Sequence, residues 1–210
     1  AEGYHGSTGN YAGGIVGEVR TSSTYKGSTQ IIGCSNRGSV TAGGYVGGIL
    51  AEIPNNSACN VLIESCFNTG TLTATNQTED QHIGGIVGMG FDRILNCYHA
   101  GTLEAGSTSG RSYRGGILGY VAKGTGTATL AHNYSVQSAS LSVGGHAEDA
   151  VLADDTTLML ASFMKEESFV DTLNRYEKPV SLYQVTFAMD SKAENDGYPV
   201  IGELEKIKNY

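Results

Sequence analysis

The chain has 210 residues and a formal net charge of −8, from 21 Asp and Glu against 13 Lys and Arg. The basic residues are scattered, which argues against a nucleic-acid or anionic-membrane partner, and no apolar run reaches the ~20 residues that span a bilayer. The 30 Gly and 3 Pro indicate many tight corners between short strands around one substantial core.

A Gly-Gly motif followed by two aliphatic residues recurs four times in the first two-thirds of the chain. The copies begin at Gly13, Gly47, Gly84 and Gly115, 31 to 37 residues apart. Units with such a period stack and bury their apolar sides against their neighbours. We expect one ladder of Ile15, Ile49, Ile86 and Ile117. We expect a second ladder on the opposite face, which would then need an outside cover, from Val16, Leu50, Val87 and Leu118.

A second motif keeps the same period and begins at Cys34, Cys66 and Cys97, with a diverged fourth copy at Asn133. In stacked turns these cysteines would lie ~4.8 Å apart as a buried ladder of reduced thiols. Cys59 lies outside this column and could instead pair with Cys66. The redox compartment is left open.

Polar residues follow two positions after each lead cysteine: Asn36, Asn68 and His99. If they face inward, their side chains should hydrogen-bond from turn to turn, as stacked amides do. A metal site at Cys97 and His99 is disfavoured, because zinc needs three or four ligands.

Aromatic residues stand one position after the lead, at Phe67, Tyr98 and Tyr134. Their parity predicts that they project outward on adjacent turns. One interpretation is a stacking platform for sugar rings or for a partner's apolar side chains. The other is an aromatic ladder packed under loops or C-terminal helices, which steadies the sheet.

The composition changes at about residue 151, so we divide the chain into a repeat domain, 1–150, and a C-terminal cap, 151–210. Asp154, Asp155 and Thr156 offer an N-cap to a helix over 158–164. A second helix is predicted over 165–174, and strands over 183–189 and 198–204. The cap should close the C-terminal end of the coil.

Short apolar runs rich in Ile, Val and Thr that end at Gly, Asn or Ser predict strands and turns rather than helical repeats. The predicted fold is all-β: a right-handed parallel β-helix, or solenoid, of about four turns with a small C-terminal α/β cap. The hand follows the strong preference of parallel crossovers.

No motif predicts catalysis, a metal or a cofactor. The nearest carboxylate groups are Glu79 with Asp80, and Glu148–Asp149 with Asp154–Asp155; all lie in polar stretches and are better explained as solvated loops or caps. Calcium at 194–197 is possible, although a plain turn explains that segment better.

The two linked motifs, over roughly 11–141, resemble the GLUG repeat of large bacterial surface and secreted proteins. The resemblance implies an exported β-helical module, often described as adhesive, and no catalytic residues. Some GLUG proteins accompany a zinc endopeptidase of the immunoglobulin-A-cleaving type, whose His-Glu-x-x-His motif is missing from this sequence.

We therefore expect a non-catalytic module of the bacterial cell surface, part of a longer multidomain chain. It would adhere to host glycans or surface proteins, or present other domains rigidly. The alternatives are a carbohydrate-active β-helix enzyme (a polysaccharide lyase or glycosidase) and a purely structural spacer.

Overall fold

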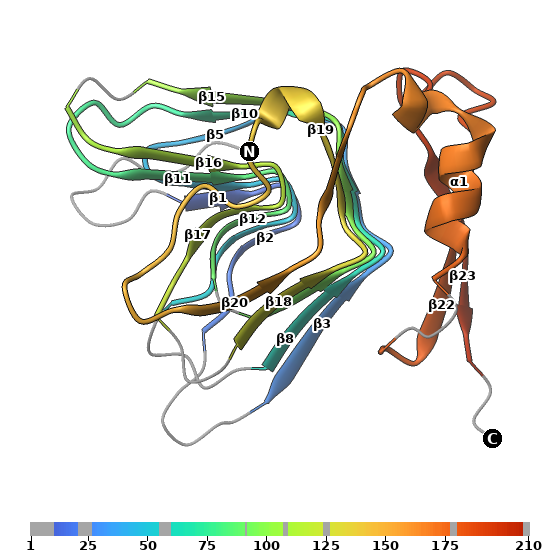
Figure 1. Ribbon diagram of the computed structural model, residues 1–210, viewed down its shortest axis with the longest axis horizontal. Helices are drawn as coiled ribbons and strands as arrows, with labels where there is room; N and C mark the ends of the chain where they lie inside the picture. Colours follow the sequence, from blue (N-terminus) through green and yellow to red (C-terminus); the bar gives the residue numbers. More distant parts are fainter. Residues whose placement is uncertain are drawn as a thin grey trace.

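The computed structural model describes residues 11–20, 27–54, 60–90, 92–106, 109–123, 127–176 and 180–207. Nearly all of its regular structure is short strands, which pair in parallel from one turn of a coil to the next (Figure 1). The predicted β-solenoid is confirmed, while its right hand stays a prediction. None of the helices in the described ranges is long and apolar enough to cross a membrane.

Each complete turn of the coil has five strands. The first turn contains β1 (Tyr11–Gly13), β2 (Val16–Glu18), β3 (Ser28–Ile32), β4 (Ser35–Asn36) and β5 (Val40–Ala42). The second contains β6 (Tyr45–Gly47), β7 (Leu50–Glu52), β8 (Asn60–Glu64), β9 (Phe67–Asn68) and β10 (Thr71–Ala74). The third contains β11 (Gln81–Gly84), β12 (Val87–Gly90), β13 (Arg93–Leu95), β14 (Tyr98–His99) and β15 (Thr102–Ala105).

The fourth turn is incomplete. It contains β16 (Ser112–Gly115), β17 (Leu118–Val121), β18 (Thr127–Ala131) and β19 (Tyr134–Val136), and then the 3-10 helix η1 (Gln137–Ala139) takes the place of a fifth strand. Two further strands, β20 (Val151–Asp154) and β21 (Thr157–Met159), pair with β18 and β19. The expected four turns are thus three complete turns and a partial one.

Equivalent strands of successive turns form five parallel sheets, which we number by their place in the turn. Sheet I is β1-β6-β11-β16, sheet II is β2-β7-β12-β17, sheet III is β3-β8-β13-β18-β20, sheet IV is β4-β9-β14-β19-β21, and sheet V is β5-β10-β15. Equivalent residues of the repeats are partners in register: Ile31 with Ile63, Ile63 with Ile94, and Ile94 with Leu130. The repeat in the sequence therefore sets the register of the sheets.

Two kinds of corner bend the chain. Between sheets I and II the first Gly of each Gly-Gly pair turns so tightly that a Cβ would overlap the carbonyl oxygen three residues later. Between sheets III and IV the chain passes through one left-handed residue in every turn, immediately before the lead position: Gly33, Ser65, Asn96 and His132, with φ between 51° and 59°. Three of the four are not glycine, which explains why composition did not reveal this corner.

The first corner overturns one expectation about the aliphatic pairs. The amides of Ile49 and Leu50 both bond to the carbonyl of Ile86, so the two residues lie on either side of the bend. Both side chains then point into the same core instead of to opposite faces. The expected outside cover is therefore unnecessary on this side of the coil.

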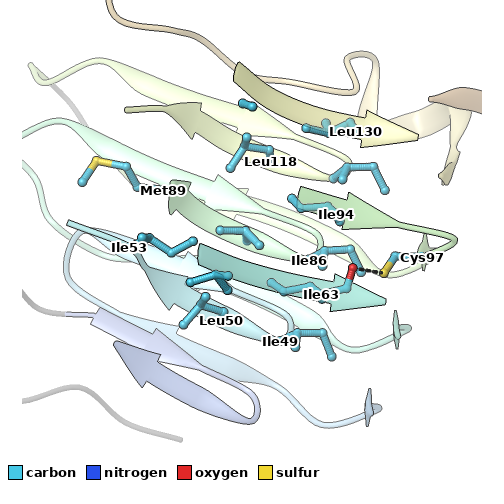
Figure 2. Packing of buried hydrophobic residues seen from close by; sticks show 14 of the residues in the cluster. Ile49, Leu50, Ile53, Ile63, Ile86, Met89, Ile94, Cys97, Leu118 and Leu130 are labelled. Atoms are coloured by element: carbon cyan, nitrogen blue, oxygen red, sulfur yellow. Dashed lines mark hydrogen bonds between the residues drawn. The ribbon is translucent and has the colours of Figure 1, made fainter. Parts of the chain in front are cut away.

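The coil has two cores. The larger lies between sheets II and III, and Figure 2 shows Ile63, Ile94 and Leu130 of sheet III stacked from turn to turn within it. The smaller lies between sheets I and V and is built from small aliphatic residues such as Val46, Leu72 and Ile83. Sheet IV connects sheet III of the larger core with sheet V of the smaller core, and its outer face contacts the C-terminal tail (Figure 1).

The tail consists of the 3-10 helix η2 (Phe163–Lys165), α1 (Glu167–Asn174) and an antiparallel hairpin of β22 (Tyr183–Ala188) and β23 (Val200–Lys206). The predicted helix over 158–164 is wrong: its first two residues belong to β21, because they still pair with the coil, and its last two belong to η2. The hairpin and α1 form the predicted cap, but they lie along the side of the coil over sheet IV (Figure 1). The coil itself continues past the expected boundary at residue 150.

Candidate functional site

The three cysteines of the column form a ladder at the corner between sheets III and IV. The amide of Cys34 donates to Sγ of Cys66, and the amide of Cys66 donates to Sγ of Cys97, both at 3.4 Å. The amide of Cys97 donates to Oδ1 of Asn133 at 2.9 Å, so the diverged fourth copy keeps the acceptor. All three sulfurs are free thiols, and burial raises the pKa of Cys66. Cys59 lies outside the described residues.

The polar column two positions later lies in register inside the coil. Asn36 Nδ2 donates to Asn68 Oδ1 at 2.7 Å, and Asn68 Nδ2 lies 3.1 Å from His99 Nδ1. Each of these side chains rests on the second glycine of a Gly-Gly pair: a Cβ at Gly48 would lie 2.5 Å from the Cβ of Asn68. The two repeated motifs are thus linked, because the glycine makes room for the polar ladder.

His99 is fully buried within this ladder. The side-chain amide of Asn68 donates to Nδ1 of His99, so the proton of the neutral ring is on Nε2. This Nε2 atom has no hydrogen-bond partner among the described residues. Desolvation lowers the pKa of His99 to about 4. The ladder is therefore neutral at pH 7 and has a structural role.

The predicted aromatic column faces outward as expected, but the C-terminal tail covers most of it. Phe67 and Tyr98 stack at 4.9 Å between ring centroids and are 1% and 0% exposed. Phe169 of α1 meets the ring of Tyr98 edge-on at 5.7 Å. Of the two interpretations of this column, the packed ladder is the one the structure shows for these two residues.

The hydroxyl of Tyr98 fixes the tail to the coil. It donates to the carbonyl of Pro199 and accepts a hydrogen bond from Asn195 Nδ2 at 3.1 Å. Thr69 of the coil donates to Asn195 Oδ1 at 2.6 Å. A stacking platform at Phe67 and Tyr98 is therefore a wrong prediction, since both rings serve the attachment of the tail.

Tyr134, the third predicted aromatic residue, has a different setting. It is only partly buried, and it lines a cleft of about 620 Å³ between the fourth turn and α1, which we call the Tyr134 cleft. The cleft is lined by Leu95, Asn96, Ala131, His132, Tyr134, Thr172, Arg175 and Tyr176. Its volume falls within the ~300–1,000 Å³ range of small-molecule sites.

The Tyr134 cleft combines aromatic and hydrogen-bonding groups. Tyr134 packs edge-on against Phe169 at 5.3 Å, and the ring of His132 lies 5.6 Å from that of Tyr176. Arg175, at the end of α1, is exposed and places its charge at the wall of the cleft. Aromatic rings beside a guanidinium can hold the apolar face and the hydroxyls of a sugar.

A second aromatic column, which the sequence analysis missed, lies on sheet I. Tyr45, His82 and Tyr113 are register partners, and Tyr120 of sheet II stacks on His82 at 4.7 Å. The signal for the sheet I residues was present in the sequence, because a Tyr or His stands two positions before every Gly-Gly pair of the repeat: Tyr11, Tyr45, His82 and Tyr113. Several of the ring faces are occupied by one another, which leaves less ring surface for a ligand than in an open stacking platform.

His82 is buried in the middle of this column. Desolvation lowers its pKa to about 4, and the charge of Asp80 opposes that effect. Asp80 itself accepts two hydrogen bonds from the guanidinium of Arg111, at 2.8 and 3.1 Å. The nearby Glu79 accepts a hydrogen bond from Asn76.

Three of the other four candidate carboxylates also have structural partners. Asp149 forms an ion pair with Lys123 at 2.8 Å. Asp154 accepts hydrogen bonds from Ser142 and Thr156, while Asp155 accepts the amide of His132. Within the described ranges, no three His, Cys, Asp or Glu side chains come together as metal ligands would.

The turn considered for calcium is held by Asp190, which the sequence analysis did not single out. Its carboxylate accepts the amides of Glu194, Asn195 and Gly197 at 2.8 to 3.0 Å. These hydrogen bonds lower the pKa of Asp190 against the opposing effect of desolvation. The plain turn thus explains this segment, and it positions Asn195 against Tyr98.

Glu64 of β8 is a buried carboxylate of the coil, 1% exposed. It accepts hydrogen bonds from the hydroxyl of Tyr176 at 2.9 Å and from the amides of Val180 and Ser181 at 2.7 and 3.0 Å. It therefore anchors the tail on sheet III and orients Tyr176 at the wall of the Tyr134 cleft.

Comparison of the chain with protein-family models, with curated proteins and with solved structures finds no match.

Proposed function

We propose that this protein is a non-catalytic, extracellular module of the bacterial cell surface that adheres to glycans through the Tyr134 cleft. The resemblance of its repeats to the GLUG motif supports export and surface display. The coil and its tail supply a rigid support, because strands pair in register through every turn. Such a support holds a shallow binding site in one geometry at little entropic cost on binding.

The Tyr134 cleft is the observation that carries the proposal. It brings Tyr134, Tyr176, Arg175 and Asn96 together in a space of about 620 Å³. Tyrosine contributes a large apolar face and a polar tip with few rotatable bonds, which makes it well suited to sugar recognition. The cleft is built from both coil and tail, so the tail has a functional as well as a stabilising role in this proposal.

The composition of the cleft favours binding over catalysis. A glycosidase of the common type needs two carboxyl groups ~5–10 Å apart on either side of the scissile bond. The described residues that line the cleft include no Asp or Glu. The enzyme alternative would need its acid and base at another place, and five of the six candidate carboxylates, all except Glu148, are engaged with structural partners.

A glycan array probed with the purified protein tests the proposal. We expect binding to a restricted set of glycans, at least tenfold weaker in Tyr134→Ala and in Arg175→Ala. Tyr183→Ala is the matched control, because Tyr183 is an exposed tyrosine of β22 that lies outside the cleft. Equal binding by wild type and Tyr134→Ala would place the ligand elsewhere.

A second candidate function is that of a rigid spacer for other domains. It is favoured by the number of chemically versatile side chains that are used internally, such as Tyr98, His99 and Glu64. A wild-type protein that binds nothing on glycan arrays and no host surface protein would support the spacer and oppose adhesion.

A further inference from the structure

A second, smaller pocket lies where the coil ends. Sheet V has three strands while sheet I has four, so the fourth turn leaves a space above β15. This pocket measures about 300 Å³. It is lined by Gly101, Thr102, Leu103, Ser112, Arg114, Ser138, Ala139, Ser140, Leu141 and Gly144.

Arg114 occupies a core column of the repeat. The equivalent residues of the three earlier turns are Ala12, Val46 and Ile83, all buried between sheets I and V. At the last turn this column ends in the guanidinium of Arg114. Neighbouring residues of a strand alternate between its two faces, so Arg114 lies on the face of β16 opposite to Tyr113. An apolar position has thus become a positive charge where the core opens.

Arg114 is the one charged residue among those lining the pocket. Within the described ranges it forms no ion pair, whereas Arg37 and Arg111 are paired with carboxylates. The remaining polar lining consists of hydroxyl groups on Thr102, Ser112, Ser138 and Ser140. A planar guanidinium matches a carboxylate bidentately, and hydroxyls beside it match hydroxyls of a ligand.

Ser140 gives the pocket wall an unusual backbone. It has φ 68° and ψ −35°, and the amide of Leu141 bonds back to the carbonyl of Ala139 at 2.8 Å. This tight reversal is uncommon for a residue other than glycine. It keeps 138–141 against the end of the coil, and strained backbone of this kind is concentrated at binding sites.

We propose that the Arg114 pocket binds a small hydroxylated carboxylate, specifically a single acidic sugar residue such as a uronic acid. The carboxylate pairs with the guanidinium of Arg114, and ring hydroxyls bond to the serine and threonine hydroxyls around it. The volume of about 300 Å³ lies at the small end of small-molecule sites, which fits one ring and no longer chain. This site is separate from the Tyr134 cleft and does not depend on it.

The net charge of −8 does not oppose such binding. At physiological ionic strength charges more than ~8 Å apart are largely screened, so the nearest charge dominates. We expect binding of D-glucuronate to weaken as salt is raised, since the pairing at the coil end is accessible to solvent.

The test is to titrate the full chain with D-glucuronate and to measure binding both by calorimetry and by the change in backbone amide chemical shifts. We expect shifts confined to 101–103, 112–114 and 138–144, and affinity at least tenfold lower in Arg114→Ala. This variant should fold, because Ala12 occupies the same column in the first turn. Arg175→Ala, which alters the Tyr134 cleft, should bind D-glucuronate like wild type.

Two probes decide the chemistry of the ligand. D-Glucose, which lacks the carboxylate, should bind at least tenfold more weakly, and inorganic sulfate should not reproduce the shifts of the serine amides. Equal affinity of wild type and Arg114→Ala for D-glucuronate, or no binding in the millimolar range, overturns the proposal. Binding that is lost in Arg175→Ala but kept in Arg114→Ala would assign the sugar to the Tyr134 cleft instead.

Discussion

His99 stands in a column that is otherwise Asn36 and Asn68, and it differs from them in carrying a titratable ring. The folded protein holds this ring neutral, with a pKa of about 4 against 6.5 for an ordinary histidine. An unfolded chain therefore binds a proton more readily than the folded one between these values. Stability contributed by the neutral ring is present above pH 6.5 and is lost as the pH falls toward 4.

His99→Asn should remove this loss, because asparagine continues the amide ladder and does not titrate. We expect wild type and variant to be similar at pH 7, and the variant to be relatively more stable at pH 5 by about 2 kcal/mol. Urea unfolding at the two pH values measures the difference. Parallel loss of stability in both proteins would show that His99 is not held neutral.

At the scale of the elements, the Gly-Gly motif is a requirement of the corner between sheets I and II. The first glycine makes the turn, and the second lies against the polar ladder. The aliphatic pair that follows fills the larger core from both sides of the bend. The motif therefore recurs because three contacts meet at one short segment in every turn.

Gly48→Ala tests this account. The added Cβ would overlap the carbonyl oxygen of Gly85 and lie 2.5 Å from the Cβ of Asn68. We expect a loss of at least ~1–3 kcal/mol in the free energy of unfolding, since such overpacking forces the backbone to shift.

The matched control for this substitution is Gly17→Ala, in the first copy of the motif. A Cβ at Gly17 meets nothing within 4 Å, so denaturant unfolding should show almost no change. Equal destabilisation by both substitutions would mean that the loss does not come from the packing of Gly48 against the polar ladder.

At the scale of the whole molecule, the tail and the coil form one unit. Phe169 and Leu173 of α1 and Phe187 of β22 pack onto Phe67 and Tyr98 of sheet IV. The outward aromatic residues of the coil would otherwise form an apolar surface along several turns. The tail thus protects the side of the solenoid and builds one wall of the Tyr134 cleft.

Phe169→Ala should loosen this contact. Phe169 is 1% exposed, and truncating a buried phenylalanine costs ~3–5 kcal/mol. We expect increased binding of a hydrophobic dye and earlier proteolytic cleavage within 160–207. Phe163→Ala, at a residue that is 50% exposed, should behave like wild type in both measurements.

The coil follows from the repeats in the sequence. A repeat of Gly-Gly-aliphatic strands and of Cys-led segments can satisfy its backbone hydrogen bonds only by stacking like on like, so the register of Cys34, Cys66 and Cys97 followed from their spacing. The helix predicted over 165–174 and the strand predicted over 183–189 also rest on local pattern, and they correspond to α1 and β22.

The surroundings of the outward-facing residues depend on the way that distant segments pack together. Parity predicts which side of a strand Tyr98 or Tyr134 faces, but not whether a segment distant in sequence covers it. The same limit applies to β21, where pairing with β19 outweighed a helix cap, and to Arg114, whose pocket exists because sheet V ends one turn early. Burial and clefts arise from contacts between segments that are distant in sequence, and the periodicity of the repeats does not predict these contacts.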